Sequence, residues 1–259
     1  MIKIKDAKAM EGMREAGRLA AELLRRCALA VEPGVTTLEI DAVARRVCSD
    51  LNVKSAFLGY HGYPGCICIS VNDEVIHGIP GPRVLNMGDV VSLDVGVVAG
   101  GWNGDNALTV TVGDVDASVT DLLDGTEEAL EAGIAAVAPG RRLSDVSAAI
   151  EKVARAHHLG IVREYVGHGI GRSLHEEPEV PNFGKPGRGP ELKEGMVICI
   201  EPMLCRGSAK VDVLDDNWTV VTRDGLPAAH FEHEVAVVAG GAEVLTPRPW
   251  WGLEARKAG

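Results

Sequence analysis

The stretch Val90-Val91-Ser92-Leu93-Asp94-Val95-Gly96-Val97-Val98-Ala99 decides the fold, because it is an apolar, β-branched run of strand length that contains one carboxylate. Gly100-Gly101 follows it and predicts a two-residue hairpin turn. Such a turn places Asp94 opposite Ala107 of the returning strand. Asp105 then lies one diagonal step away on the same face, roughly 7 Å off. The hairpin therefore predicts two carboxylates that point into one space.

Two carboxylates at that separation repel each other. A folded chain keeps them buried only where cations neutralise them or one of them stays protonated. The hairpin also fits a solvated surface turn with two exposed aspartates, because exposed aspartate is common. The hairpin alone leaves both interpretations open, and other parts of the chain decide between them.

The composition fits a globular protein with a cationic ligand. The chain has 259 residues, 46% of them apolar, which is enough for a large core. Its net charge of −11 argues against a nucleic-acid or membrane surface. The sequence shows no apolar signal region and no membrane-spanning run, so we expect a cytoplasmic protein. Cys27, Cys48 and Cys199 fall in apolar stretches and are expected to pack as small hydrophobes, which argues against a thiolate zinc site.

The second half of the chain repeats the plan of the first. Apolar periodicity predicts helices over 8–31, 37–51, 121–138 and 144–158. At an offset of 107, Glu201 matches Asp94, and at an offset of 127, Glu232 matches Asp105. Each half, about 1–120 and 121–259, then supplies two acids from equivalent strands. We therefore expect one domain over 1–259, with pseudo-two-fold symmetry about a central sheet.

Four converging carboxylates call for about four positive charges, which two divalent ions supply. His168 stands between glycines and is expected as the fifth ligand. Ligands that are mostly oxygen, with one imidazole, favour manganese, cobalt or iron and leave zinc and magnesium open. Two such ions roughly 3.5–4 Å apart hold a bridging water or hydroxide that acts as a nucleophile, so we expect hydrolysis. His77 and His175 lie near these motifs, and each fits either a packed residue or a hydrogen-bond donor to an oxyanion.

These residues resemble the type I methionine aminopeptidases, which are metallopeptidases of the pita-bread fold. The resemblance runs from the first helix to about Pro247. The motifs that carry it are Tyr60-His61-Gly62-Tyr63-Pro64, Asn72 to Pro80, Ser92-Leu93-Asp94-Val95 with Gly104-Asp105, Gly167 to Pro178, Ile200-Glu201-Pro202-Met203 and Phe231-Glu232-His233. The resemblance implies an α+β fold in which helices cover the outer face of a central antiparallel sheet.

The resemblance also implies a role for each site residue. The implied metal ligands are Asp94, Asp105, His168, Glu201 and Glu232. Glu201 would also act as general base, and His77 and His175 would contact the scissile amide and the tetrahedral intermediate. The implied methionine pocket is formed by Tyr60, Tyr63, Cys68, His77 and Trp218, although Trp218 also fits an ordinary buried aromatic residue.

The activity implied is removal of the amino-terminal methionine from nascent polypeptides whose second residue is small. The family default is a monomer. As partners we expect nascent polypeptides and a transient association with the ribosome, and the acidic charge argues against nucleic acid and membrane. The sequence departs from the family pattern at Phe57, Leu174, His230 and Asn106-Ala107-Leu108, and these departures bear on pocket shape and turnover.

Three alternatives remain open at this point. A proline-directed aminopeptidase or dipeptidase shares the fold but usually carries a large amino-terminal domain. A relative that binds polypeptide or RNA without catalysis typically loses metal ligands, whereas all five stand in this sequence. A purely structural metal site would be coordinatively closed.

Overall fold

The structure is a computed structural model that describes residues 1–250 and 257–258. Its helices are Ala7–Ala28 (α1), Thr37–Asp50 (α2), Ala117–Ala135 (α3) and Leu143–Ala156 (α4), with a 3-10 turn at Tyr60–Gly62. The strands are Lys54–Ser55 (β1), Cys68–Val71 (β2), Glu74–Ile76 (β3), Val90–Ala99 (β4), Trp102–Val112 (β5), Gly160–Ile161 (β6), Gly167–Gly169 (β7), Glu176–Val180 (β8), Val197–Ile200 (β9), Met203–Cys205 (β10), Val211–Val213 (β11), Val220–Thr222 (β12), Ala228–His230 (β13), Glu232–Val238 (β14), Gly241–Val244 (β15) and Lys257–Ala258 (β16).

Polar side chains mark where the helices begin. Asp6 accepts a hydrogen bond from the backbone N–H of Ala9 at the start of α1. Thr36 and Glu39 cap the start of α2 reciprocally. Asp116 accepts hydrogen bonds from two backbone N–H groups of α3, which is why α3 begins earlier than the predicted residue 121. The predicted helices are therefore confirmed, with a shifted start for α3.

The predicted helices over 8–31 and 121–138 both end too late. After Ala28 and Ala135 the backbone N–H groups of Val31 and Val137 bond to carbonyls three residues back, as in a tight turn. The tighter turns lead into the proline-glycine pairs that follow each helix. The differences of a few residues are ordinary at helix ends and leave the order of elements as predicted.

The predicted hairpin is confirmed in its register. Asp94 of β4 pairs with Ala107 of β5, and Gly96 pairs with Asp105. Gly100 and Gly101 adopt φ of 56° and 77°, which a residue with a side chain rarely does, so they make the two-residue turn possible.

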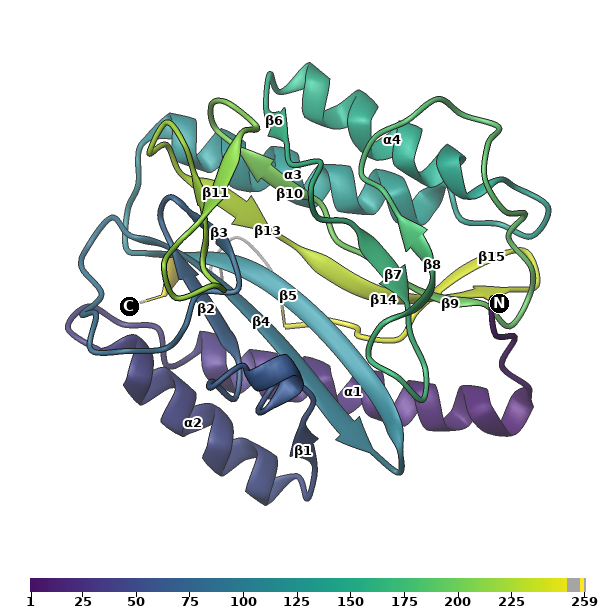
Figure 1. The fold of residues 1–259 in the computed structure, drawn as a ribbon, viewed down its shortest axis with the longest axis horizontal. Helices are drawn as coiled ribbons and strands as arrows, with labels where there is room; N and C mark the ends of the chain where they lie inside the picture. The colour runs from purple at the N-terminus through teal and green to yellow at the C-terminus, as the bar shows by residue number, and fades with distance from the viewer. Residues whose placement is uncertain (251–256, 259) are drawn as a thin grey trace.

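The central sheet runs in the order β1-β4-β5-β14-β9-β7-β8, and β2, β15 and β16 pair at its sides. Neighbouring strands are antiparallel except for the parallel pair β16–β5. Helix α1 contacts β4 and β5, whereas α3 contacts β9 and β14. Figure 1 shows the pairs α1–α2 and α3–α4 along opposite halves of this sheet. The fold is the α+β, pseudo-two-fold arrangement that the sequence predicts.

A large apolar core lies between the sheet and the helices. Leu23 and Leu24 of α1 pack in one cluster with Leu93 and Leu108 of the hairpin, and Ile200 of β9 belongs to the same cluster. One core therefore joins the two halves. Among the described residues, none of the helices has the length and apolarity that crossing a bilayer requires.

Candidate active site

One cavity brings together the site residues that the sequence predicts. It is lined by Phe57, Tyr60, Tyr63, Cys68, His77, Asp94, Asp105, His168, Leu174, His175, Glu201, Trp218 and Glu232. These residues come from both halves of the chain. Every residue expected to act as a metal ligand, a catalytic group or a pocket residue is among them.

A row of three residues across the sheet sets the spacing of the acids. Strand β5 lies between β4 and β14, and its Ala107 pairs with Asp94 on one side and with Glu232 on the other. Paired residues project from the same face, so the two carboxylates flank the small side chain of Ala107. Asp105 lies two residues earlier on that face of β5, and Glu201 directly follows β9 beside β14. Four carboxylates from neighbouring strands therefore face one cavity.

His168 is held with one ring nitrogen toward these acids. Its Nδ1 lies 2.9 Å from the backbone oxygen of Gly169, to which it can only donate. The unprotonated Nε2 then lies 3.7 Å from Asp105 Oδ2 and 3.6 Å from Glu201 Oε1. Glycines on both sides allow this, since a Cβ atom on either would lie 2.2–2.3 Å from a backbone oxygen. The lone pair of His168 Nε2 and the carboxylate oxygens of Asp105 and Glu201 therefore face the same space.

The donor atoms of this cavity fit divalent cations. Asp94 Oδ1, Asp105 Oδ1 and Glu232 Oε1 are buried and have no hydrogen-bond partner within the described part of the chain. Buried anionic oxygens that lack donors are costly unless cations balance them. A set of carboxylate oxygens with one imidazole nitrogen is the chemistry that first-row divalent ions accept.

The proton affinities of these groups follow from the same burial. Burial, and after it repulsion between the acids, raises the pKa of Asp94, Glu201 and Glu232 well above the usual range. Burial also raises the pKa of Asp105. For His168, burial and the neighbouring His175 lower the pKa to about 3, so the imidazole is neutral and able to bind a cation. Without cations these acids therefore tend to keep their protons. Divalent ions that bind in the cavity would displace the protons.

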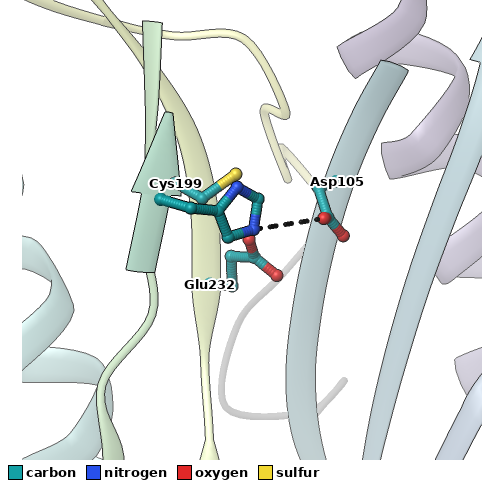
Figure 2. A group of neighbouring side chains, drawn as sticks. Asp105, Cys199 and Glu232 are labelled. Atoms are coloured by element: carbon teal, nitrogen blue, oxygen red, sulfur yellow. Dashed lines mark ion pairs between the residues drawn. The ribbon is translucent and has the colours of Figure 1, made fainter. Parts of the chain in front are cut away.

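Cys199 packs in an apolar cluster, as the sequence predicts, and its thiol also lies beside the acids, which was not predicted. One donor atom from each of Asp105, His168, Cys199 and Glu232 lies within 4.8 Å of the others. Figure 2 shows Asp105, Cys199 and Glu232 projecting toward a common space. The sequence does indicate this position of Cys199. Cys199 and Glu201 are two residues apart, so alternation along a strand places both on the same face. Burial raises the pKa of the thiol well above its usual value, so it is protonated.

Two further buried groups next to these acids were not predicted. The carboxylate of Glu234 accepts a hydrogen bond of 3.3 Å from the backbone N–H of Asp105, and its pKa is raised by burial. His230, noted from sequence only as a departure, has its Nε2 3.5 Å from Glu201 Oε2. Burial lowers the pKa of His230 to about 3, so it faces Glu201 as a neutral ring.

The predicted methionine pocket is the apolar end of the cavity. The ring centroids of Tyr63 and Trp218 lie 5.0 Å apart, nearly perpendicular to each other. Cys68 pairs with Asp94 across β2 and β4, so the pocket adjoins the acids. Phe57 and Leu174, both departures from the family pattern, line the same cavity. The pocket is therefore walled by aromatic rings and a thiol, which suits a thioether.

His175 and His77 border the acids. Tyr60 Oη lies 2.7 Å from His175 Nδ1, and the rings of His168 and His175 are 4.3 Å apart. Burial lowers the pKa of His77 to about 4 and also lowers that of His175. The ring of Tyr165 packs edge-on against His77 at 5.6 Å.

Residues 11–239 match the model of metallopeptidase family M24. The chain is 46% identical to methionine aminopeptidase 1 of Bacillus subtilis over 246 residues, which cover 95% of this chain and 99% of that protein. It is 48% identical to methionine aminopeptidase 1 of Mycobacterium tuberculosis over 249 residues, with coverage of 93% and 94%.

Solved structures agree with this assignment. A methionine aminopeptidase from Thermotoga maritima matches with a TM-score of 0.93 at 44% identity, covering 95% of this chain and 99% of that one. A prolidase from Pyrococcus furiosus matches with a TM-score of 0.77 at 22% identity, covering 94% of this chain and 65% of that one, which shows a common fold alone. The full-length identity at 46–48% places the chain in metallopeptidase family M24 and, within it, among the methionine aminopeptidases, which are metal-dependent exopeptidases.

Proposed function

We propose that this protein removes the amino-terminal methionine from polypeptides whose second residue is small. The observation that carries the proposal is that one cavity has a polar end and an apolar end that adjoin each other. Four carboxylates and a neutral imidazole lie at one end, and an aromatic pocket that fits a thioether lies beside them. A peptide whose first side chain fills the pocket brings its first peptide bond to the acids.

The cofactors in this proposal are two divalent ions, held by Asp94, Asp105, His168, Glu201 and Glu232. Oxygen-rich ligands favour manganese, cobalt or iron, and zinc remains compatible with the set. Bound ions would supply a lowered pKa for water and Lewis acidity toward the peptide carbonyl.

In the proposed reaction Glu201 acts as the general base. Its Oε1 lies 3.6 Å from His168 Nε2 and its Oε2 lies 3.5 Å from His230 Nε2, and both rings are neutral. When the site holds its ions, Glu201 is ionised. It can then accept a proton from the attacking water and pass that proton to the leaving amine.

His175 is placed to donate a hydrogen bond. If the Tyr60 hydroxyl donates to Nδ1 of His175, the ring carries its proton on Nε2, the nitrogen left to face substrate. A neutral imidazole N–H stabilises an oxyanion without giving up its proton early. We propose that His175 contacts the tetrahedral intermediate in this way and that His77 contacts the scissile amide.

We also propose that residues 1–259 act as one catalytic domain, as a monomer in the cytoplasm. The substrates are then the amino termini of nascent chains, met during transient contact with the ribosome. The net charge of −11 supports a short-lived contact with the ribosome, because ribosomal RNA repels an acidic protein.

The test is a peptide assay on the purified protein with manganese or cobalt. Release of methionine from Met-Gly and Met-Ala peptides is the expected result, with loss on chelation and recovery when metal is restored. Leu-Gly peptides test whether the pocket selects methionine, and we expect slower cleavage. Met-Leu peptides test whether the second residue must be small, and we expect slower cleavage there too. Preferred cleavage of Xaa-Pro peptides would replace this proposal with a proline-directed one. Metal binding without cleavage of either class would support a binding protein instead.

A further inference from the structure

The segment that follows β15 contacts the back of the strand that carries Glu232. Strand alternation puts Glu232 of β14 on the cavity face and His233 on the opposite face. Leu245 packs against α1, where a Cβ atom on Gly17 would lie 2.4 Å from the Leu245 carbonyl oxygen. In Figure 1 this yellow segment runs from β15 back across the middle of the sheet. It thus lies between α1 and β14.

Arg248 of this segment holds the beginning of β14. Its Nη2 donates to the backbone oxygen of Glu232 at 2.8 Å and to Nε2 of His233 at 3.0 Å. Because Nε2 accepts, the proton of His233 is on Nδ1, which donates to Thr246 Oγ1 at 2.8 Å. The backbone N–H of Glu234 donates to the same hydroxyl at 3.2 Å. Residues 232–234 are therefore each bonded to one short segment.

These bonds matter most at Glu232, because it is the first residue of β14. Strands β14 and β5 pair only at Glu232–Ala107 and His233–Asn106, so few ladder bonds fix this end. The backbone oxygen of Glu232 is bonded by Arg248 instead. A displaced peptide group at Glu232 would move its carboxylate away from Asp105 and His168, which share the cavity with it.

The charge of Arg248 also complements the site. Its Nε and Nη1 are shielded from solvent, and burial lowers its pKa to about 10, which still leaves it charged at neutral pH. The carboxylates of Glu127 and Glu232 favour that charge.

We propose that Arg248 is a positioning residue for the metal centre: through its hydrogen bonds to the Glu232 peptide oxygen and to His233, it fixes the Glu232 carboxylate from the back of the sheet. This inference rests on the proposed function, because it takes Glu232 as a metal ligand. Loss of residues that hold a ligand in place typically weakens metal binding 10- to 100-fold.

The test is calorimetric titration of the metal-free protein with Mn²⁺ alone. Arg248→Met keeps the length of the side chain but removes its donors and its charge, and we expect Mn²⁺ binding at least about 10-fold weaker. Arg248→Lys keeps the charge and a single donor nitrogen and is expected to restore part of that loss. Arg14→Met is the matched control, since Arg14 bonds to Glu243 of β15 at the surface. Thr246→Val removes the support of the other His233 nitrogen and should weaken Mn²⁺ binding in the same direction.

The outcomes separate the alternatives. Removing a positive charge by itself would strengthen binding of a divalent cation. Equal or tighter Mn²⁺ binding by Arg248→Met would therefore overturn the positioning role. A lower Tm of the metal-free variant with unchanged Mn²⁺ affinity would also overturn it, because it would show that Arg248 only stabilises the fold. If the wild-type protein binds Mn²⁺ but releases no methionine, the proposed function fails while this comparison of affinities still stands.

Discussion

Asp94 and Glu232 lie on strands that are not neighbours in the sheet, yet both pair with the same residue, Ala107 of β5. The two carboxylates therefore share one face with only a methyl group between them. Ala107 is fully buried, so a larger side chain there would press on its neighbours instead of extending into solvent. A small side chain at this position keeps the space between the acids open for cations.

We expect Ala107→Val to weaken Mn²⁺ binding by at least about 10-fold, because the added methyl groups separate Asp94 from Glu232. Overpacking a buried site also costs about 1–3 kcal/mol of unfolding free energy. Ala44→Val in α2 is the control, because Ala44 is equally buried but far in sequence from any site residue. Calorimetry and urea unfolding on both variants check this. A loss of stability with normal Mn²⁺ affinity would show that Ala107 does not set the spacing.

Gly169→Ala should displace His168. A Cβ atom at Gly169 would lie 2.2 Å from the backbone oxygen of Glu177, so β7 and β8 would have to separate. We expect loss of most metal affinity and methionine release. Gly81→Ala is the control, because a Cβ atom there would lie 3.8 Å from its nearest neighbour, the backbone oxygen of Ile79, which is an ordinary contact. Full Mn²⁺ affinity in the Gly169 variant would mean that the strands adapt without moving the imidazole.

His157 makes stability depend on pH away from the site. Its Nδ1 lies 2.8 Å from Asp121 and its Nε2 lies 3.0 Å from Glu128, and these hydrogen bonds raise its pKa. A pKa raised on folding gives stability that is complete below the unfolded value of about 6.5 and is lost as pH rises through the folded value. We expect His157→Gln to cost under about 1 kcal/mol near about pH 6 and almost nothing near about pH 9. Urea unfolding of the wild type and of this variant at both pH values is the measurement, and an equal cost at the two values would contradict a role for the charge of His157.

The sequence predicted the acids of the site well because strand geometry is regular. A two-residue turn fixes the register of a hairpin, and alternation fixes the face, so Asp94 and Asp105 could be placed without a structure. The repeat then carried the same reasoning to Glu201 and Glu232. Which ring nitrogen of His168 faces the acids could not be predicted, since it depends on a backbone oxygen of its own strand.

The residues that were missed depend on contacts between distant segments. Cys199 stands among apolar residues, and only the convergence of four strands shows that its thiol meets the acids. Arg248 gave no signal at all, because an arginine side chain is ordinarily solvated. Local patterns predict which face a side chain takes, but not what a remote segment brings to that face.

Glu201→Gln should lower kcat by about 10²- to 10⁴-fold at saturating Mn²⁺, because an amide of the same shape cannot accept a proton. The far-ultraviolet circular dichroism spectrum and the Tm of the metal-free protein should change little. Glu243→Gln, which alters a surface acid bonded to Arg14, serves as the control. A near-normal kcat in the Glu201 variant would remove this residue as the base.

Tyr60→Phe tests how His175 is oriented. The Tyr60 hydroxyl lies 2.7 Å from His175 Nδ1, and without it neither the ring orientation nor the proton position is fixed. Misplacing a group that stabilises the transition state lowers kcat by about 10- to 100-fold while leaving KM nearly unchanged, because the phenyl ring still lines the pocket. Tyr165→Phe is the control, since Tyr165 contacts the ring of His77 and keeps that contact as phenylalanine. An increase in KM with normal kcat would show that the hydroxyl binds substrate rather than positioning His175.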